Sequence, residues 1–117
     1  MADHDKTLPT GVVVSAYYRV HPDDRQTFID AVIPEMTAAE KIKGCRFYAF
    51  AQDLIDPNTF HLIEAYENER AYEEHENSET FLKALSHVVK NVRILDRQGV
   101  RYDVEKLHID DPRARVS

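Results

Sequence analysis

Hydrophobic residues fall into short alternating runs and into longer runs with helical spacing, which predicts a mixed domain of strands and helices. Residues 12–20 are β-branched and aromatic and end at a His-Pro pair, so we expect a strand there. Residues 45–53 and 59–67 predict two more strands, since an Asp-Pro-Asn turn signal lies between them. Apolar and polar side chains alternate in residues 99–107, which predicts a last strand.

Helices are predicted between the first and second strands and between the third and the last. A helix over residues 22–43 begins with a proline and two aspartates, which favour a helix start, and Gly44 is suited to close it. Pro34 is expected to kink this helix, because its missing N–H removes one backbone hydrogen bond. A short helix is expected over residues 69–76. A longer one is expected after Ser78, whose hydroxyl can cap the first turn.

The predicted order of elements is βαββαβ, the ferredoxin-like arrangement of an α+β fold with an antiparallel four-stranded sheet. The second and third predicted strands are apolar on both faces. In the second, Phe47, Ala49 and Ala51 lie opposite Tyr48 and Phe50. Two helices can cover only one face of such a sheet. The uncovered apolar face therefore predicts a homodimer in which two sheets pack face to face.

The length and charge of the chain restrict the class of protein. At 117 residues it is expected to form one domain over residues 10–108, with flexible polar tails at 1–9 and 109–117. The net charge of −6 repels phosphate backbones, so we expect no nucleic-acid partner. No apolar run approaches the roughly 20 residues that cross a bilayer, so we expect no membrane partner. A lone Cys45 suits a reducing compartment, which predicts a cytoplasmic protein.

The stretch from residue 61 to residue 81 combines many glutamates with two histidines. On a helix with 100° per residue, Ala71, Tyr72 and His75 share one arc, whereas the glutamates mostly point to solvent. His75 is thus a polar group that points inward, beside a phenol. The six histidines show no zinc-site spacing and the chain has no calcium-binding loop, so we expect no metal site.

Glu64 is a second candidate, since it lies in the middle of a predicted strand that is otherwise apolar. A charge at such a position is costly unless it is paired or faces a cavity. Arg46 or Arg101 could pair with it, and a role in a pocket is an equally open alternative. Cys45 has no basic partner nearby in the sequence and is expected to be a small buried hydrophobic residue.

Several short motifs together resemble the antibiotic biosynthesis monooxygenase family. They follow the family's order and spacing over about residues 11–107 and comprise Gly-Cys-Arg-Phe-Tyr at 44–48, Asp-Pro-Asn-Thr-Phe at 56–60, Ile-Glu-Ala-Tyr at 63–66, Ala-Tyr-Glu-Glu-His at 71–75, and Ser78 with Phe81. The resemblance implies a dimeric α+β barrel with one pocket per subunit between helices and sheet. It implies one of several activities. Some members oxidise polycyclic anthrones or quinols with O2 and no cofactor, others degrade haem, and the autoinducer-2 branch isomerises a phosphorylated signalling sugar derivative.

Matching the family's site residues to this sequence narrows these activities. Polyketide-oxidising members carry an Asn and a Trp on the third strand and a Tyr on the next helix. The matched positions here hold Leu62, Tyr66 and Tyr72, so only the last is retained. The axial histidine of haem-degrading members falls at Leu85 and their helical Trp at His75, which disfavours haem. The Glu-Ala-Tyr triplet and this histidine are more similar to the quinol monooxygenase and isomerase branches.

The resemblance, with these residues, predicts a cofactor-independent monooxygenase that oxidises a small aromatic, quinol or anthrone-type substrate with O2. His75 is the expected base, since its ordinary pKa of about 6.5 suits proton removal at neutral pH. Glu64 is expected in the same pocket. Tyr66 and Tyr72 are expected to donate hydrogen bonds to the developing enolate oxygen. The expected apolar wall for the substrate consists of Phe28, Met36, Leu62, Phe81 and Leu85.

Two other functions remain open from the sequence. An isomerase could use Glu64 and His75 to move a proton on a small oxygenated substrate without O2. It would need a polar subsite, for which the candidates are Arg46, Lys83 and Arg101. A non-catalytic barrel that binds a small ligand would need His75 only as a hydrogen-bonded pocket residue.

Overall fold

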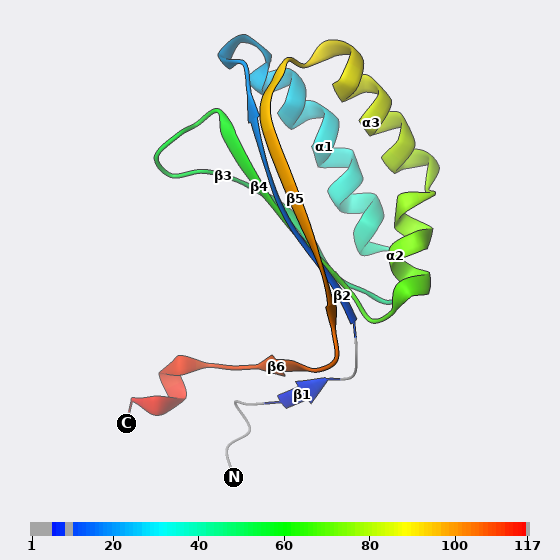
Figure 1. The fold of residues 1–117 in the computed structure, drawn as a ribbon, viewed down its shortest axis with the longest axis vertical. Coiled ribbons are helices and arrows are strands. Elements are labelled where there is room, and N and C mark those ends of the chain that lie inside the picture. Colours follow the sequence, from blue (N-terminus) through cyan, green and yellow to red (C-terminus); the bar gives the residue numbers. More distant parts are fainter. Residues whose placement is uncertain (1–5, 9–10, 117) are drawn as a thin grey trace.

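Four strands form one antiparallel sheet in the order β3-β4-β2-β5, and helices cover one face of it (Figure 1). The computed structural model describes residues 6–8 and 11–116. The main elements in chain order are β2 (Gly11–Val20), α1 (Arg25–Glu40), β3 (Cys45–Gln52), β4 (Thr59–Tyr66), α2 (Glu69–Glu76), α3 (Glu79–Asn91) and β5 (Ile94–Val104). This arrangement confirms the predicted ferredoxin-like α+β fold.

The long strand β2 lies between β4 and β5, and the cross-strand register decides which side chains share a face. Ala16 of β2 is opposite Leu62 of β4 on one side and Gly99 of β5 on the other. At one edge of the sheet, Tyr48 of the edge strand β3 is opposite Glu64 of β4. Because successive side chains of a strand alternate between faces, Leu62, Glu64 and Tyr48 all point to the face covered by the helices.

β5 differs from the predicted last strand at both ends. It begins at Ile94 rather than Gly99 and ends at Val104, whereas Leu107 belongs to a separate strand. The polar residues 96–98 interrupt the apolar alternation and hide this part of the strand in the sequence. They are nevertheless paired with β2, whose length provides backbone partners as far as Arg19, opposite Asp96.

The two end segments contain regular structure where the sequence predicts frayed tails. β1 (Lys6–Leu8) pairs in antiparallel fashion with β6 (Leu107–Ile109), and the short 3-10 helix η2 (Pro112–Arg115) follows. This two-stranded ribbon extends away from the sheet and helices in Figure 1. The rest of the predicted N-terminal tail, at 1–5 and 9–10, lies outside the described residues, as does residue 117.

Helix α1 follows the short 3-10 helix η1 (Pro22–Asp24), as the proline signal predicts, and ends at Glu40 before the predicted limit at residue 43. Gly44 completes the connection to β3 with a φ of 95°, in the left-handed region that favours glycine. A Cβ at Gly44 would lie 2.9 Å from the Cβ of Ala71. α1 continues past Pro34, and the kink expected there remains a prediction.

Capping side chains define the starts of α2 and α3, and the Ser78 cap of α3 is the one that the sequence predicts. The Asn68 side chain accepts a 2.9 Å hydrogen bond from the backbone N–H of Ala71, and the Ser78 hydroxyl accepts one of 3.2 Å from that of Phe81. Each cap satisfies a backbone donor that the first helical turn leaves unpaired. Within the described residues, no helix has the length and apolar composition needed to cross a membrane.

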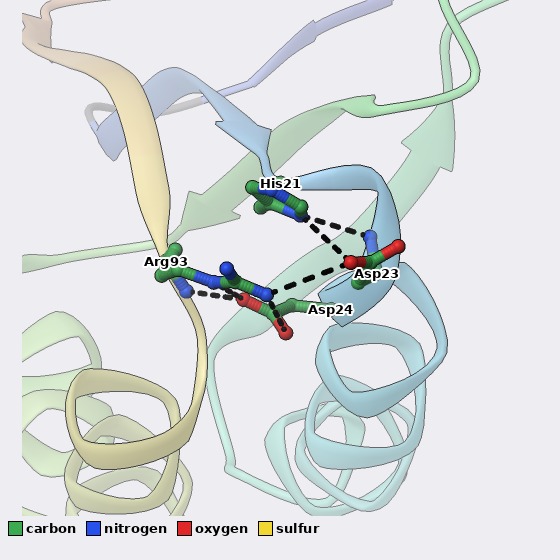
Figure 2. Close-up of polar contacts among 4 residues, drawn as sticks. All are labelled: His21, Asp23, Asp24 and Arg93. Atoms are coloured by element: carbon green, nitrogen blue, oxygen red, sulfur yellow. Dashed lines mark hydrogen bonds and ion pairs between the residues drawn. The ribbon is translucent and has the colours of Figure 1, made fainter.

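A polar cluster ties the start of α1 to the connection between α3 and β5 (Figure 2). The backbone N–H and Nε of Arg93 donate hydrogen bonds of 2.8 and 2.9 Å to Oδ2 of Asp24, and Nδ1 of His21 accepts one of 3.1 Å from the backbone N–H of Asp23. These bonds to Arg93 hold the pKa of Asp24 at about 2, so its carboxylate is charged at neutral pH. The two long helices are thereby joined at one end of the layer.

The hydrophobic core lies between the helices and the inner face of the sheet. One buried cluster combines Val20, Phe28, Val32, Phe60, Val88 and Val92. The opposite face of the sheet is uncovered in the single chain, with Phe47 44%, Ile63 40% and Tyr102 52% exposed. The prediction that the sheet has two apolar faces, of which the helices cover only one, is therefore confirmed.

Candidate active site

A cavity of about 170 Å³ lies between the helices and the inner face of the sheet. Phe28 and Val32 of α1 and Phe81, Leu85 and Val88 of α3 form an apolar wall. Polar side chains reach the cavity from every layer, and they include Glu35, Tyr48, Glu64, Tyr72, Glu76 and Arg97. Apolar surface with a few convergent polar groups is typical of sites for small molecules.

Two tyrosines hold two buried carboxyl groups in this cavity. Tyr48 on β3 donates a hydrogen bond of 2.6 Å to Oε1 of Glu35 on α1, and Tyr66 on β4 donates one of 2.6 Å to Oε1 of Glu64. Glu35 is only 4% exposed and Glu64 only 5%. A buried carboxyl group is costly unless it is hydrogen-bonded, so the two tyrosines make this arrangement possible.

The imidazole of His75 lies near both carboxyl groups. Its Nε2 atom is 3.3 Å from Oε1 of Glu35 and 4.0 Å from Oε1 of Glu64. This nitrogen is buried and has no hydrogen-bond partner among the described residues. The rings of Tyr48 and Phe81, each centred 4.8 Å from the imidazole, shield it from solvent. His75 is therefore enclosed by aromatic rings and by the two carboxyl groups.

Burial determines the protonation of these three groups. Desolvation raises the pKa of Glu35 and of Glu64 to about 7, because it penalises the charged form of a carboxyl group. Desolvation also lowers the pKa of His75 to about 4, since its charged form is the protonated one. His75 is thus neutral at pH 7, and its contacts with the carboxyl groups are not ion pairs. The two carboxyl groups, by contrast, exchange protons near neutrality.

The two tyrosines remain donors under the same conditions. Burial, together with the neighbouring carboxyl groups, raises the pKa of Tyr48 and of Tyr66 above the ordinary value for a phenol. Both hydroxyls are therefore protonated at neutral pH and can donate to Glu35 and Glu64. Each hydrogen bond acts against desolvation and favours the charged form of the carboxyl group that accepts it.

Two arginines of β5 lie at the side of the site. The guanidinium carbon of Arg101 is 4.6 Å from the centre of the Tyr72 ring, and this arginine also donates hydrogen bonds to Glu69 and Asp103. These contacts hold the Tyr72 ring against β5. Arg97, from the same strand, lines the cavity itself and places a positive charge there.

Most residues predicted from the sequence converge on this cavity. Glu64 and Tyr72 line it. Tyr66 and His75 do not line the cavity, but both contact Glu64. Of the expected apolar wall, these residues line the cavity: Phe28, Leu62, Phe81 and Leu85. Met36 is placed elsewhere, since its Sδ accepts a 3.3 Å hydrogen bond from the backbone N–H of Phe50 within the core. The catalytic and binding roles of all these residues remain predictions.

Four polar residues of the cavity were not among the site residues predicted from the sequence: Glu35, Tyr48, Glu76 and Arg97. Glu35 had a usable signal, because it lies on the apolar stripe of α1 between Val32 and Ala39, where a charged residue is out of place. Tyr48 was placed on the face opposite Phe47, Ala49 and Ala51, but no role in a site was predicted for it. Arg97 lies in the part of β5 that the apolar alternation did not reveal.

Within the described residues Glu64 forms no ion pair with Arg46 or Arg101, the two partners considered from the sequence. Its hydrogen bond comes from Tyr66, while Arg101 binds Glu69 and Asp103. The Nε and one terminal nitrogen of Arg46 are buried and have no hydrogen-bond partner among the described residues. Glu64 instead faces the cavity.

Metal-ligand geometry is not seen in the part of the chain that the structure describes. No set of three or more His, Cys, Asp or Glu side chains in residues 6–8 and 11–116 is arranged to hold a metal ion. Cys45, half-buried at the start of β3, has a pKa that burial raises, so its thiol is protonated at neutral pH.

A comparison with known protein families identifies the same family that the sequence motifs resemble. The family model described as antibiotic biosynthesis monooxygenase matches residues 11–86. This segment contains β2, α1, β3, β4 and α2, and hence both carboxyl groups, both tyrosines and the histidine described above. No curated protein matches the chain.

Solved structures share the fold at low sequence identity. A protein from Nitrosomonas europaea, named as a candidate antibiotic biosynthesis monooxygenase, is 23% identical, with a TM-score of 0.73 over 80% of this chain and 88% of that one. A candidate of the same name from Deinococcus radiodurans is 18% identical, with a TM-score of 0.71 over 78% and 89%. A protein from Shewanella oneidensis is 14% identical, with a TM-score of 0.75 over 88% and 98%. At these identities the likeness shows the fold alone.

Proposed function

Because the chain belongs to the antibiotic biosynthesis monooxygenase family, we propose that it is a cofactor-independent monooxygenase that oxidises a small aromatic, quinol or anthrone-type substrate with O2. The observation that carries the proposal is the cavity of about 170 Å³, in which an apolar wall faces buried carboxyl groups. An electron-rich aromatic ring can pack against Phe28 and Phe81. A carboxyl group with a pKa near neutrality can take its acidic proton.

The proposed reaction converts a CH2 group of an anthrone-type substrate into a carbonyl group. Removal of one C–H proton leaves an anion whose electrons reduce O2, and a C–O bond forms to give a peroxide. Loss of the second C–H proton and cleavage of the O–O bond then produce the C=O group. One oxygen atom of O2 enters the product, and the other leaves as water with both substrate hydrogens.

The site residues have distinct roles in this proposal. Glu64 lines the cavity and is the proton acceptor, while Tyr66 holds it in place. Tyr72 donates a hydrogen bond to the oxygen of the substrate anion, as the sequence predicts. His75, the base expected from the sequence, lies behind the carboxyl groups and acts through Glu64. Phe28, Leu62, Phe81 and Leu85 bind the aromatic ring.

The proposal also includes the state of the protein. The uncovered apolar face of the sheet supports a homodimer packed sheet against sheet, and the single cysteine remains in keeping with a cytoplasmic location. No haem takes part, since Leu85 occupies the position of the axial histidine of haem-degrading relatives. Titration with haem is therefore expected to leave the haem absorption spectrum unchanged.

Oxygen consumption tests the function directly. Purified protein is given a panel of anthrones and hydroquinones, and O2 uptake is compared with that of heat-denatured protein and of the Glu64→Gln variant. We expect uptake above autoxidation for the native chain alone. Uptake that never exceeds autoxidation with any member of the panel contradicts the proposal. Turnover that continues under strict anoxia would identify the isomerase alternative, for which Arg97, rather than Lys83 or Arg101, is the cation at the cavity.

A further inference from the structure

Glu35 brings a second carboxyl group to the cavity from α1, on the helical side, whereas Glu64 reaches it from β4 in the sheet. The two groups have matching surroundings. Each accepts a 2.6 Å hydrogen bond from a buried tyrosine, and each has its Oε1 atom within 4.0 Å of Nε2 of His75. No lysine or arginine of the described residues forms an ion pair with either. The cavity thus holds two carboxyl groups where the reaction above uses one.

Two carboxyl groups that are so deeply buried cannot both be charged without a large desolvation cost. The ionisable groups near them come from every neighbouring element: Tyr18 on β2, Cys45 and Tyr48 on β3, Tyr66 on β4, Arg97 on β5, and Tyr72, His75 and Glu76 on α2. The only cation among them is Arg97, since His75 is neutral at pH 7, and Glu76 adds further negative charge. Near neutral pH the lowest-energy state therefore has one proton on the pair and one negative charge.

The surroundings also decide which member keeps the proton. The positive charge of Arg97 lowers the pKa of Glu64, whereas no cation among the described residues lowers that of Glu35. Glu76 favours the protonated form of both carboxyl groups, and Glu35 additionally faces the charge of Glu64. Neighbouring carboxyl groups whose environments push their pKa values apart are the usual arrangement of a paired acid and base.

We propose that Glu35 and Glu64 form a proton-sharing pair in which Glu64 is the catalytic base and Glu35 the catalytic acid. Both groups line the cavity and so can touch the substrate. His75 and the two tyrosines are positioning residues that keep the carboxyl groups in place. This inference rests on the proposed monooxygenase function and assigns it a second catalytic residue.

The pair accounts for every proton of the reaction. The Glu64 carboxylate takes the first C–H proton, and the resulting substrate anion adds O2 to form a peroxide anion. Glu35 gives its proton to the terminal peroxide oxygen and forms a hydroperoxide. The Glu35 carboxylate then takes the second C–H proton while the O–O bond breaks, and the departing hydroxide takes the proton held by Glu64 and leaves as water. The pair again holds one proton, now on Glu35, and Glu64 is again a carboxylate.

The pH dependence of turnover tests this assignment. A base and an acid predict a bell-shaped profile of kcat for the native chain. Glu35→Gln is expected to lower kcat by roughly 10²-fold or more and to remove the alkaline limb, because the acid is absent. Glu64→Gln is expected to lower kcat at every pH, and Glu35→Asp to restore part of the activity. Glu40 is an exposed glutamate on the same helix, so Glu40→Gln is the control and should have the kcat profile of the native chain. If Glu35→Gln keeps native kcat and both limbs, the pair is refuted while the monooxygenase function stands.

A second measurement does not depend on turnover. Infrared difference spectra of the native chain, recorded between pH 5 and 8, are expected to show the C=O stretch of a protonated carboxyl group that disappears near pH 7. The band should be clearly weaker in Glu35→Gln, which keeps only the carboxyl group of Glu64, and unchanged in Glu40→Gln. A native chain without this band at pH 6 contradicts the pair, whatever the activity assays show. A native chain that has the band but takes up no O2 supports the pair and refutes the proposed reaction.

Discussion

Tyr48 and Glu35 join the sheet to helix α1 through one buried hydrogen bond of 2.6 Å. The phenol is on β3 and only 3% exposed, and the carboxyl group that accepts its proton lies on the other layer of the domain. The bond therefore does two things. It satisfies a carboxyl group that burial would otherwise destabilise, and it fixes the distance between sheet and helix at the cavity.

Replacing Tyr48 by Phe removes this bond and little else. We expect the free energy of unfolding to fall by about 1–3 kcal/mol, the usual cost of leaving a buried polar group unpaired. The pKa of Glu35 should also rise further, since the tyrosine favours its charged form. Urea unfolding measures the first effect. The matched control is Tyr17→Phe, which removes a hydrogen bond to the exposed Asp96 and should cost clearly less. Equal losses for the two variants would contradict this account of Tyr48.

His75 should remain neutral well below the ordinary pKa of a histidine. Burial lowers its pKa to about 4, so nuclear magnetic resonance of the imidazole should show no protonation until the pH approaches that value. The His75→Gln spectrum identifies the signal. A depressed pKa means that the unfolded chain binds a proton more readily than the folded chain. The contribution of His75 to stability is therefore fully present above pH 6.5 and is lost as the pH falls through about 4. A midpoint at 6.5 or above would show that the ring is charged in the site.

The two carboxyl groups have the opposite effect on stability. Their pKa is raised from 4.5 to about 7 on folding, so the folded chain binds more protons between these values. The stability they contribute is fully present below pH 4.5 and is lost as pH rises through about 7. Glu35→Gln removes one of the two groups and should make the free energy of unfolding less dependent on pH, by up to about 1.4 kcal/mol per pH unit. Urea unfolding from pH 4.5 to 7.5 measures this, with Glu40→Gln as the control. Parallel curves for the native chain and Glu35→Gln would count against the raised pKa.

The alternation of apolar residues was enough to predict the order of elements and the faces of β3 and β4, because it depends on local spacing. It failed where pairing with another strand decides the structure. Residues 96–98 are polar and belong to β5 only because β2 offers them backbone partners. Similarly, β1 and β6 are too short to show a pattern, and each exists through its pairing with the other.

The candidate site was predicted in part for a similar reason. Tyr72 and His75 share a helical arc with each other, so their common direction follows from sequence spacing. Glu35 lies far from Glu64 in the chain, and only the packing of α1 on the sheet brings the two carboxyl groups to one cavity. The same packing buries His75 and lowers its pKa, which moves the expected base behind the carboxyl groups. The spacing of residues in the sequence does not show burial of this kind.

The outer face of the sheet should hold a second copy of the chain. Ile63 on β4 is opposite Ala49 on β3 and Ser15 on β2, and Ser15 is opposite Val100 on β5, so a charge at position 63 would lie near the middle of the face. Ile63 is 40% exposed in the single chain, and Ile63→Glu would bury that charge between two sheets. We expect light scattering after size exclusion to give twice the chain mass of 13.6 kDa for the native protein and a shift towards the single chain for Ile63→Glu.

The control for this variant lies in the loop between β3 and β4. Leu54 is fully exposed there, so Leu54→Glu adds the same charge away from the sheet face and should leave the dimer intact. The Ile63→Glu chain should keep its circular dichroism spectrum, because the side chain lies outside the core between helices and sheet. A native protein that has the mass of one chain, or an Ile63→Glu protein as dimeric as Leu54→Glu, would mean that the apolar face serves something other than self-association.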